Sequence, residues 1–283
     1  MKMMITGAGG QLGREMVAQW SGRHELVLSD MDTPIDRLEA VRDAVRANEP
    51  DLIVNCAAYN RVDDAEKEIE AAFRANALGP RNLAIVSEES GIPLVHFSTD
   101  YVFDGTSESP LLEYDATNPR SVYGRSKVAG EQAVIQHASQ FYLVRVAWLI
   151  GHGGNNFVET MLGVGAKRDR LTVVDDQTGS PTFCEDVVKG VERLIEGADY
   201  GIYHMTGNGQ CTWCEFAREI FRQAGMTGVT VDPVTTEEFG SVAPRPRYSV
   251  LRNLMLEVSV GDHMPEWQDG LARYLVRRGS DAL

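Results

Sequence analysis

The fold is decided by the stretch Lys2-Met-Met-Ile-Thr6-Gly7-Ala-Gly-Gly10-Gln-Leu-Gly13, in which a short apolar run leads directly into three glycines spaced three residues apart. A helical pattern follows and runs to Trp20. Glycines between a strand and a helix allow a tight bend, and they let backbone N–H groups approach a pyrophosphate at the positive end of the helix. The stretch therefore predicts a dinucleotide-binding strand–turn–helix unit. The alternative is a glycine-rich turn that serves packing alone.

The rest of the first half repeats this alternation of apolar runs and helical patterns. Strands are predicted over residues 25–29, 51–55, 92–97 and 142–146, and helices over residues 36–47, 69–90 and 123–137. Short apolar strands that alternate with helices are typical of a parallel sheet covered on both faces. The predicted fold class is α/β, with a Rossmann-type doubly wound parallel sheet.

The second half is less regular, with glycines and prolines frequent between its elements. Strands are predicted over residues 171–174, 201–205 and 229–231, and helices over residues 156–166, 185–196, 213–224 and 267–277. We expect a smaller α/β lobe over the carboxyl edge of the sheet, where open α/β folds bind their ligands. Residues 1–150 and about 182–206 are predicted to form the dinucleotide-binding domain, and residues about 151–181 and 207–283 the substrate-binding lobe.

Composition and charge exclude several classes of partner. Of the 283 residues, 43% are hydrophobic and 24% charged, as in ordinary globular proteins. The net charge of −14 repels nucleic acid and anionic lipid. No apolar run is long enough for a membrane helix, and residues 1–6 are too short for a signal-peptide core. We therefore expect no nucleic-acid partner, no membrane partner and a cytoplasmic location.

The four cysteines indicate no disulfide framework, which agrees with a reducing compartment. Cys211-Thr-Trp-Cys214 has the spacing of half a zinc site or of a redox dithiol. No further ligands follow at zinc spacing, and the pair opens an amphipathic segment instead of following the first strand. We interpret this pair as structural.

Asp30 is the candidate ligand of the adenosine ribose. It ends the second predicted strand, where the dinucleotide fold uses an acidic residue to accept hydrogen bonds from the ribose hydroxyls. Its charge repels a 2′-phosphate; Asp32 adds negative charge, and Arg14 is the nearby cation. The charges favour NADH over NADPH, with use of both left open. An ordinary surface carboxylate is the alternative for Asp30.

Tyr123-Gly-Arg-Ser-Lys127 provides a candidate acid–base pair, because a separation of four residues puts both side chains on one face of a helix. A free phenol has a pKa of about 10, and a neighbouring ammonium stabilises the phenolate and lowers that pKa. Ser98-Thr99 leaves the fourth predicted strand at its carboxyl end, where a hydroxyl could orient a substrate carbonyl toward the phenol. The alternative for Tyr123 is an exposed tyrosine on a solvated helix without a catalytic role. The alternative for Ser98-Thr99 is a hydroxyl pair that only ends a strand.

The order of these segments resembles the extended short-chain dehydrogenase/reductases. The likeness is carried by Gly7-x-x-Gly10-x-x-Gly13, Asn55-Cys-Ala-Ala58, Ser98-Thr-Asp-Tyr-Val-Phe103 and Tyr123-x-x-x-Lys127. Within that group the chain resembles the dTDP-4-dehydrorhamnose reductases, through Gly10-Gln-Leu-Gly13, Ala57-Ala-Tyr-x-x-Val-Asp63-x-Ala-Glu66, Gly154-Asn-Asn-Phe157, Asp176-Gln-x-Gly-x-Pro-Thr182 and Arg245-Pro-x-x-Ser249. The likeness spans essentially the whole chain.

The resemblance implies NAD(P)H-dependent reduction of the 4-keto group of dTDP-4-dehydro-β-L-rhamnose to dTDP-L-rhamnose in nucleotide-sugar biosynthesis, with the smaller lobe binding the dTDP-linked deoxy-ketosugar. Tyr123 would give a proton to the keto oxygen as hydride arrives from the nicotinamide, Lys127 would hold the nicotinamide ribose and lower the pKa of the tyrosine, and Thr99 would complete the catalytic triad. The implied cofactor-binding residues are Gly7, Gly10, Gln11, Leu12, Gly13, Asp30, Ala57, Ala58, Tyr59, Asn76, Tyr123 and Lys127. The implied substrate-binding residues are Thr99, Asp100, Tyr101, Val102, Trp148, Asn155, Asn156, Phe157 and Arg245, with Arg245 a candidate ligand of the diphosphate.

Four features depart from the family's pattern. Residues 31–35 form a shorter stretch than usual, so no adenine contact is assigned to them, and Asn60 stands where a threonine is usual. Family members are usually described as using NADPH, whereas Asp30 favours NADH. Some relatives form dimers through a magnesium ion held by glutamates; Glu15 and Glu185 fit, but Arg277 stands where a third glutamate is expected. No metal-binding residue is therefore assigned, Mg²⁺ is left open, and the chain is expected to be a monomer or a homodimer.

Other functions stay open at this point. A reductase of a related nucleotide-linked deoxy-ketosugar is the main alternative. A sugar-nucleotide epimerase or 4,6-dehydratase is disfavoured, since the dehydratases carry an acidic pair after the threonine and here Asp100 is followed by Tyr101. A non-catalytic regulatory subunit, like that of methionine adenosyltransferase, shares the fold. The intact pair of Tyr123 and Lys127 argues against that function.

Overall fold

The computed structural model describes residues 1–30 and 33–281. Its centre is a six-stranded parallel sheet in the order β10-β5-β4-β3-β1-β2. The strands are β1 (Lys2–Thr6), β2 (Glu25–Ser29), β3 (Leu52–Asn55), β4 (Leu94–Thr99), β5 (Phe141–Val146) and β10 (Gly201–His204). Almost every residue of β1, β3, β4 and β5 is buried, which confirms the sheet predicted from the apolar runs.

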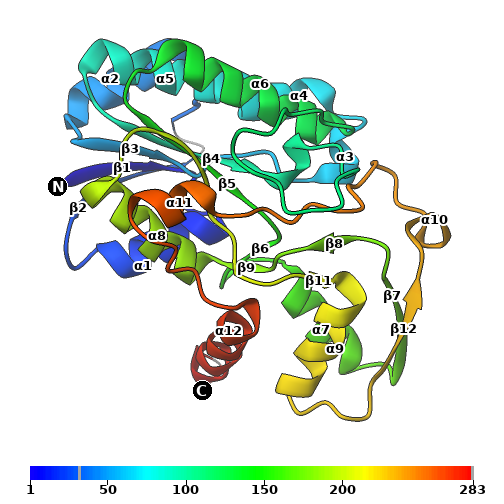
Figure 1. Ribbon diagram of the computed structural model, residues 1–283. Coiled ribbons are helices and arrows are strands. Elements are labelled where there is room, and N and C mark those ends of the chain that lie inside the picture. Colours follow the sequence, from blue (N-terminus) through cyan, green and yellow to red (C-terminus); the bar gives the residue numbers. More distant parts are fainter. Residues whose placement is uncertain (31–32, 282–283) are drawn as a thin grey trace.

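Helices cover both faces of this sheet (Figure 1). One face carries α2 (Leu38–Asn48), α5 (Gly79–Ser90) and α6 (Val122–His137), and the other carries α1 (Gln11–Trp20) and α8 (Cys184–Gly197). The side chains of successive residues of β1 point alternately to the two faces of the sheet, as strand geometry requires. Met4 packs in the core beneath α2 and α5, whereas Met3 and Ile5 pack in the core beneath α1 and α8. The doubly wound α/β fold is confirmed.

The order of the strands reverses beside β1, which pairs with β2 on one side and with β3 on the other. In doubly wound sheets such a switch point opens a crevice beyond the carboxyl ends of the two strands. Thr6 and Asn55 end β1 and β3 in register, and the Thr6 Oγ1 hydroxyl donates to Asn55 Oδ1 at 2.7 Å. The crevice therefore starts at the residues that lead into the glycine turn.

The helix predicted over residues 69–90 is interrupted. α4 (Ile69–Phe73) leads into a π-helical turn, η1 (Arg74–Leu78), before α5 begins. Asn76 lies in this turn with only 1% of its surface exposed. Isolated π turns inside helices are frequent at functional sites. The prediction of one continuous helix was wrong, because a single periodic pattern carries no sign of a π turn.

A second core lies at the carboxyl end of the sheet (Figure 1). It is built from α7 (Phe157–Gly165), α9 (Trp213–Gln223), α12 (Trp267–Asp281) and the parallel pair β7 (Arg170–Val174) and β12 (Thr230–Val234). Cys211 and Cys214 are buried in it as free thiols, which agrees with the structural interpretation of that pair.

Several short elements were not predicted. They are α3 (Val62–Ala65), the 3₁₀ turn η2 (Asp100–Val102), β6 (Leu149–Ile150), β8 (Thr178–Gly179), β9 (Thr182–Phe183), β11 (Cys211–Thr212), α10 (Thr236–Phe239) and α11 (Leu254–Ser259). Segments of two to six residues are too short to show a hydrophobic period.

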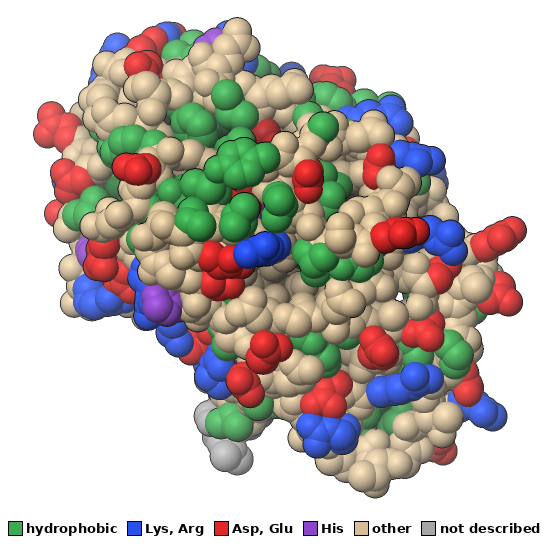
Figure 2. All heavy atoms as spheres, in the orientation of Figure 1, with side chains coloured by type: hydrophobic (Ala, Val, Ile, Leu, Met, Phe, Trp, Pro, Cys, Tyr) green, Lys and Arg blue, Asp and Glu red, His purple; other side chains and the backbone are tan. Residues whose placement is uncertain are grey.

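The sequence has 27 Lys and Arg residues against 41 Asp and Glu residues, and charged side chains of both signs lie on the surface. On the face drawn in Figure 2, Lys and Arg side chains are dispersed among Asp and Glu side chains. Within the described residues, no helix has the length and apolar character needed to cross a membrane.

Candidate active site

A cavity of about 910 Å³ occupies the crevice at the carboxyl ends of the strands. The loops after β1, β2, β3 and β4 line it, together with the first turn of α1 and one face of α6. The residues predicted from the sequence that line it are Gly7, Gly10, Gln11, Leu12, Asp30, Ala57, Ala58, Thr99, Asp100, Tyr101, Tyr123, Lys127 and Trp148. The fold thus brings most of the predicted site residues to one place.

The glycine turn forms one end of this cavity. Gly7 has a φ of +67°, and a Cβ there would lie 2.5 Å from the backbone nitrogen of Ala57. A Cβ on Gly13 would lie 2.4 Å from the Gly7 carbonyl oxygen, so Gly13 serves the close packing of turn and helix and does not line the cavity. Gly10 caps α1 without any side chain, which leaves the N–H groups of the first helical turn open to an anion. This cradle fits the pyrophosphate of a dinucleotide.

Gln11 ties the glycine turn to the chain after β6. Its Oε1 accepts from the Gly151 N–H at 2.9 Å and from Asn156 Nδ2 at 3.3 Å, and its Nε2 donates to the Asn155 carbonyl at 3.3 Å. Arg14 donates to the Gly153 carbonyl from the next turn of α1. The cofactor-binding turn and residues 151–156 are therefore held in a fixed relation.

Asp30, the predicted ligand of the adenosine ribose, lines the cavity. Its Oδ2 accepts from the Gly9 N–H at 3.0 Å, and a Cβ on Gly9 would lie 2.3 Å from that oxygen. The carboxylate is therefore fixed against the glycine turn, directly after β2, where the dinucleotide fold binds the ribose hydroxyls. Asp32, which was expected to add negative charge, lies outside the described residues.

Lys127 is buried on α6, with 3% of its surface exposed. Its Nζ donates to the carbonyl oxygen of Phe97 in β4 at 2.6 Å. Burial lowers the pKa of this ammonium to about 8, and the carboxylate of Glu131, one helical turn further along, opposes that change. An ammonium has three N–H donors, and the contact with Phe97 uses one of them.

Tyr123 stands one helical turn before Lys127 and faces the same cavity. Burial raises the pKa of its phenol to about 12, while the hydroxyl of Thr99 opposes this change. The expected lowering of this pKa by Lys127 is not found, because desolvation dominates and the charge of Asp100 raises the pKa further. The phenol is protonated at neutral pH, which is the state of a proton donor.

The segment after β4 holds Thr99 next to the phenol. Thr99 Oγ1 donates to Asp100 Oδ1 at 2.9 Å and accepts from the Tyr101 N–H at 3.2 Å, which caps η2. The Tyr101 ring meets the Tyr123 ring edge to face, with 5.6 Å between centroids. Burial raises the pKa of Asp100 to about 6. Val102 is fully buried in a separate apolar cluster and is not among the residues that line the cavity.

Asn76 and Tyr59 lie behind the lining. Asn76 Oδ1 accepts from the Tyr59 N–H at 2.8 Å, and its Nδ2 donates to the Tyr59 carbonyl at 2.8 Å and to Ser126 Oγ at 3.0 Å. The π turn η1 directs this amide between the segment after β3 and helix α6. In the chain alone, Asn76 supports the strand end that presents Ala57 and Ala58.

The predicted substrate residues beyond Trp148 are engaged within the chain and are not among the lining residues of the cavity. Asn156 caps α7 by accepting from the Glu159 N–H at 3.0 Å. The Phe157 ring lies against Trp213, with 4.6 Å between centroids. Arg245 makes a two-pronged ion pair with Asp63 of α3, at 3.1 and 2.8 Å. Their roles toward substrate stay predictions.

Comparison with known proteins addresses the family directly. Residues 1–279 match the sequence model of the RmlD substrate binding domain. The chain belongs to the RmlD substrate binding domain family.

Several proteins with solved structures or assigned activities resemble the chain over most of its length. A dTDP-4-dehydrorhamnose reductase from Clostridium acetobutylicum has 44% sequence identity and a TM-score of 0.96 over 99% of this chain and 100% of that one. A dTDP-4-dehydrorhamnose reductase from Bacillus anthracis, solved in complex with NADP, has 41% identity and a TM-score of 0.94 over 98% and 99% of the two chains. The dTDP-4-keto-6-deoxy-D-glucose reductase of Streptomyces niveus is 42% identical over 88% of each chain. The predicted family is confirmed.

The magnesium site that the family resemblance implied does not fit this chain. Both oxygens of Glu15 lie close to Arg277 Nη1, at 2.8 and 2.9 Å. Glu185 accepts from Lys189 Nζ at 2.5 Å, and Arg273 lies 3.8 Å from it. Within residues 1–30 and 33–281, no three His, Cys, Asp or Glu side chains are grouped so as to hold a metal ion. Guanidinium groups stand where a cation would be bound.

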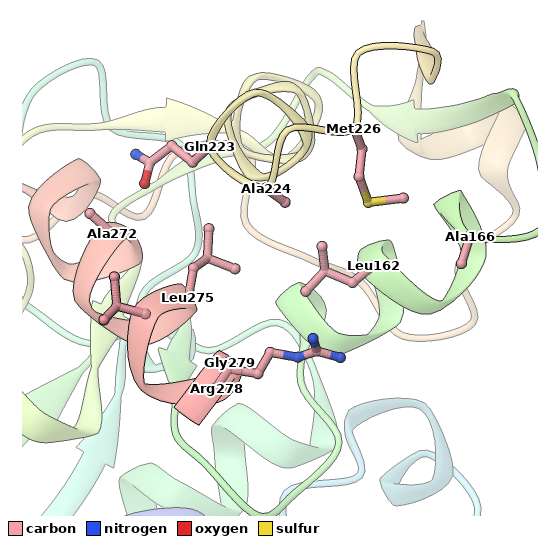
Figure 3. A pocket seen from close by; sticks show the side chains of 10 residues that line it. Leu162, Ala166, Gln223, Ala224, Met226, Ala272, Leu275, Arg278 and Gly279 are labelled. Atoms are coloured by element: carbon pink, nitrogen blue, oxygen red, sulfur yellow. The ribbon is translucent and has the colours of Figure 1, made fainter. Parts of the chain in front are cut away.

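A second cavity, of about 670 Å³, lies between α7, α9 and α12 (Figure 3). Apolar side chains surround it, including Leu162 of α7, Met226 just after α9 and Leu275 of α12. The one charged side chain in its lining, Arg278, donates to both oxygens of Glu159, at 2.9 and 3.0 Å. None of the residues predicted from the sequence lines this space.

Sequence reasoning missed several residues of the site. Asn55 and Trp213 line the main cavity, and Asp63 holds Arg245. Asn55 and Asp63 stand inside segments that carried the family resemblance, but no role was assigned to them. Trp213 lies between the two cysteines that were interpreted as structural, and no local signal shows that its ring reaches the crevice.

Proposed function

We propose that this protein reduces the 4-keto group of dTDP-4-dehydro-β-L-rhamnose to a hydroxyl, forming dTDP-L-rhamnose, with NADH or NADPH as the coenzyme. The observation that carries the proposal is one cavity that holds the glycine cradle, Thr99, Tyr123 and Lys127 together. Membership of a family whose relatives are named as reductases of dTDP-linked sugars supports it.

The residues of the chain divide the work as follows. The turn from Gly7 to Gly13 and the start of α1 bind the pyrophosphate. A bound nicotinamide coenzyme supplies the hydride that reaches the C4 carbon of the sugar. Tyr123 Oη, protonated at neutral pH, gives its proton to the keto oxygen, and the Thr99 hydroxyl orients that oxygen. Lys127 Nζ uses its further N–H donors on the nicotinamide ribose.

Asp30 supports a preference for NADH. Its carboxylate is fixed at the adenosine end by the Gly9 N–H, where a 2′-phosphate would add negative charge beside it. The Bacillus anthracis relative binds NADP in its crystal, so both coenzymes must be compared directly in this protein.

A second candidate is reduction of a closely related sugar, dTDP-4-keto-6-deoxy-D-glucose. The Streptomyces niveus relative, which bears the name of that activity, is as similar in sequence as the relatives named for the rhamnose precursor. Both reactions use the same acid–base residues, so they differ only in how the sugar ring is held.

The test follows the nicotinamide absorbance with dTDP-4-dehydro-L-rhamnose generated in situ, and NADH or NADPH supplied separately. We expect oxidation that depends on the keto sugar, with the higher kcat/KM for NADH. Turnover of dTDP-4-keto-6-deoxy-D-glucose alone would establish the second candidate. Silence with both sugars, in protein that binds the coenzyme, would contradict the reductase function.

We further propose that residues 1–150 and about 182–206 act as the coenzyme domain and the remainder as the sugar-nucleotide lobe. The placement of α8 and β10 on the main sheet and the separate core of α7, α9 and α12 support this division. The cytoplasmic location, the absence of a nucleic-acid partner and the monomeric or homodimeric state stay predictions.

A further inference from the structure

Trp148, just beyond the carboxyl end of β5, has an uncommon backbone conformation. Its φ is +45°, in the left-handed region that residues other than glycine rarely adopt. It stands two residues beyond the end of β5 and lines the cavity that also holds Thr99 and Tyr123. Such conformations persist only where the surrounding structure fixes them, and they cluster at functional sites.

The indole of Trp213 provides the main contact. The two rings are stacked with 3.5 Å between centroids and 7° between planes. Gly179 also packs against Trp148, since a Cβ there would lie 2.5 Å from the ring atom Cε2. The stack joins the end of the main sheet to the first residue of α9, from the second core.

Trp213 is itself fixed by polar contacts. Its Nε1 donates to Gln177 Oε1 at 3.2 Å, and Gln177 Nε2 donates to Thr236 Oγ1 at 2.8 Å. Thr212 caps α9 directly before it, with Glu215 completing a capping box. The ring of Phe157 lies against it from α7. Trp213 is therefore held by its own lobe, while its ring lines the cavity.

We propose that Trp213 is a positioning residue for the keto sugar: stacked on Trp148, it fixes the aromatic wall of the cavity that contains Thr99 and Tyr123. This inference rests on the proposed reductase function. A rigid aromatic wall restricts where the sugar ring can lie, and so sets the approach of its keto oxygen to the Tyr123 hydroxyl. The segment Cys211-Thr-Trp-Cys214 then contributes to the site through its tryptophan, while its cysteines stay in the second core.

The stack of Trp148 and Trp213 has a spectroscopic signature, and the kinetics of variants show whether the stack also positions the substrate. Two indoles in parallel contact couple electronically, and the far-ultraviolet circular dichroism should show an exciton couplet. Trp213→Phe should remove the couplet but keep a ring against Trp148, and therefore keep most of the activity. Trp213→Leu should remove both the couplet and the ring contact with Trp148. It should lower kcat/KM for the keto sugar about tenfold or more, and leave the Kd for NADH unchanged. Trp20→Phe, in the core beneath α1 and α8, is the matched control and should change neither the couplet nor kcat/KM.

Three results would overturn the inference. They are a wild type without the couplet, a folded Trp213→Leu variant with wild-type kcat/KM, and equal losses in the Phe and Leu variants. Calorimetric titration with dTDP-L-rhamnose in the presence of NAD⁺ separates this inference from the proposed function. If the wild type turns over neither keto sugar, the proposed function fails. Weaker binding of dTDP-L-rhamnose to Trp213→Leu would still support the positioning role, and unchanged binding would overturn it.

Discussion

Lys127 predicts how the activity depends on pH. Burial lowers the pKa of this ammonium from 10.5 to about 8. In the free protein, about one tenth of the molecules carry the charge at pH 9, and about one hundredth at pH 10. Because kcat/KM reports the ionisation of free enzyme, we expect it to fall about tenfold for each pH unit above about 8.

The contribution of Lys127 to stability changes in the opposite direction over the same range. The unfolded chain keeps the Lys127 proton up to a pKa of about 10.4, whereas the folded chain loses it near pH 8. Between these values the unfolded state binds more protons, so the contribution of Lys127 to the free energy of unfolding rises with pH. The titration of Lys127 therefore does not itself unfold the protein between about pH 8 and about pH 10, so the loss of kcat/KM that it causes arises in the site.

The assay measures initial rates of coenzyme oxidation across this pH range at low concentrations of both keto sugar and coenzyme, so that free enzyme is the reference state. Lys127→Arg is the matched variant, because a guanidinium stays charged throughout. Its rate at neutral pH should be lower, but its profile should lack the fall above pH 8. A wild-type kcat/KM that stays level to about pH 10, or the same fall in Lys127→Arg, would refute the reasoning.

Three further predictions follow from single contacts. Asp30→Asn keeps an acceptor for the Gly9 N–H but removes the charge, so the ratio of kcat/KM for NADPH to that for NADH should rise about tenfold; an unchanged ratio would show that Asp30 does not select the coenzyme. The buried pair of Arg145 and Glu131 has side chains only 4% and 3% exposed, so Arg145→Met should lower the free energy of unfolding by about 3–5 kcal/mol. As the control, Arg170→Met breaks an exposed ion pair with Asp232 and should lower the free energy of unfolding by less than about 1 kcal/mol. Equal losses for the two variants in denaturant titrations would contradict this account. Glu66 accepts from the Val122 N–H at the start of α6, so Glu66→Ala should lower kcat by more than it raises KM, whereas Glu66→Gln should retain most of the rate; steady-state kinetics decide, and a change in KM alone would mean that Glu66 does not position Tyr123.

Local patterns in the sequence predicted much of the fold. The apolar runs and glycine turn that predict β1 and α1 reflect burial and backbone sterics, which act over a few residues. The π turn around Asn76 depends on a partner seventeen residues away, the backbone of Tyr59. No local period records such a contact, and the prediction of a continuous helix was therefore wrong.

The same limit applies to the site: local patterns predicted several of its residues, but not the contacts between segments that are distant in the sequence. Gly7, Thr99, Tyr123 and Lys127 could be found because each stands at a fixed offset from a strand end or on one helix face. The pairing of Arg245 with Asp63 and the stack of Trp148 on Trp213 join residues 182 and 65 positions apart. Such contacts arise only when the lobes pack, and the sequence alone does not give their geometry. The lowered pKa of Lys127 belongs to the same class, because it follows from complete burial.

The central claim is hydride transfer to C4 of a dTDP-linked keto sugar with Tyr123 as the proton donor. The most direct measurement uses coenzyme that carries deuterium at the transferable position of the nicotinamide, with dTDP-4-dehydro-L-rhamnose as substrate and NMR of the product. We predict deuterium at C4 of the sugar with the wild type, and none with Tyr123→Phe, although that variant still binds the coenzyme. A product without deuterium at C4, or transfer by Tyr123→Phe at the wild-type rate, would contradict the account.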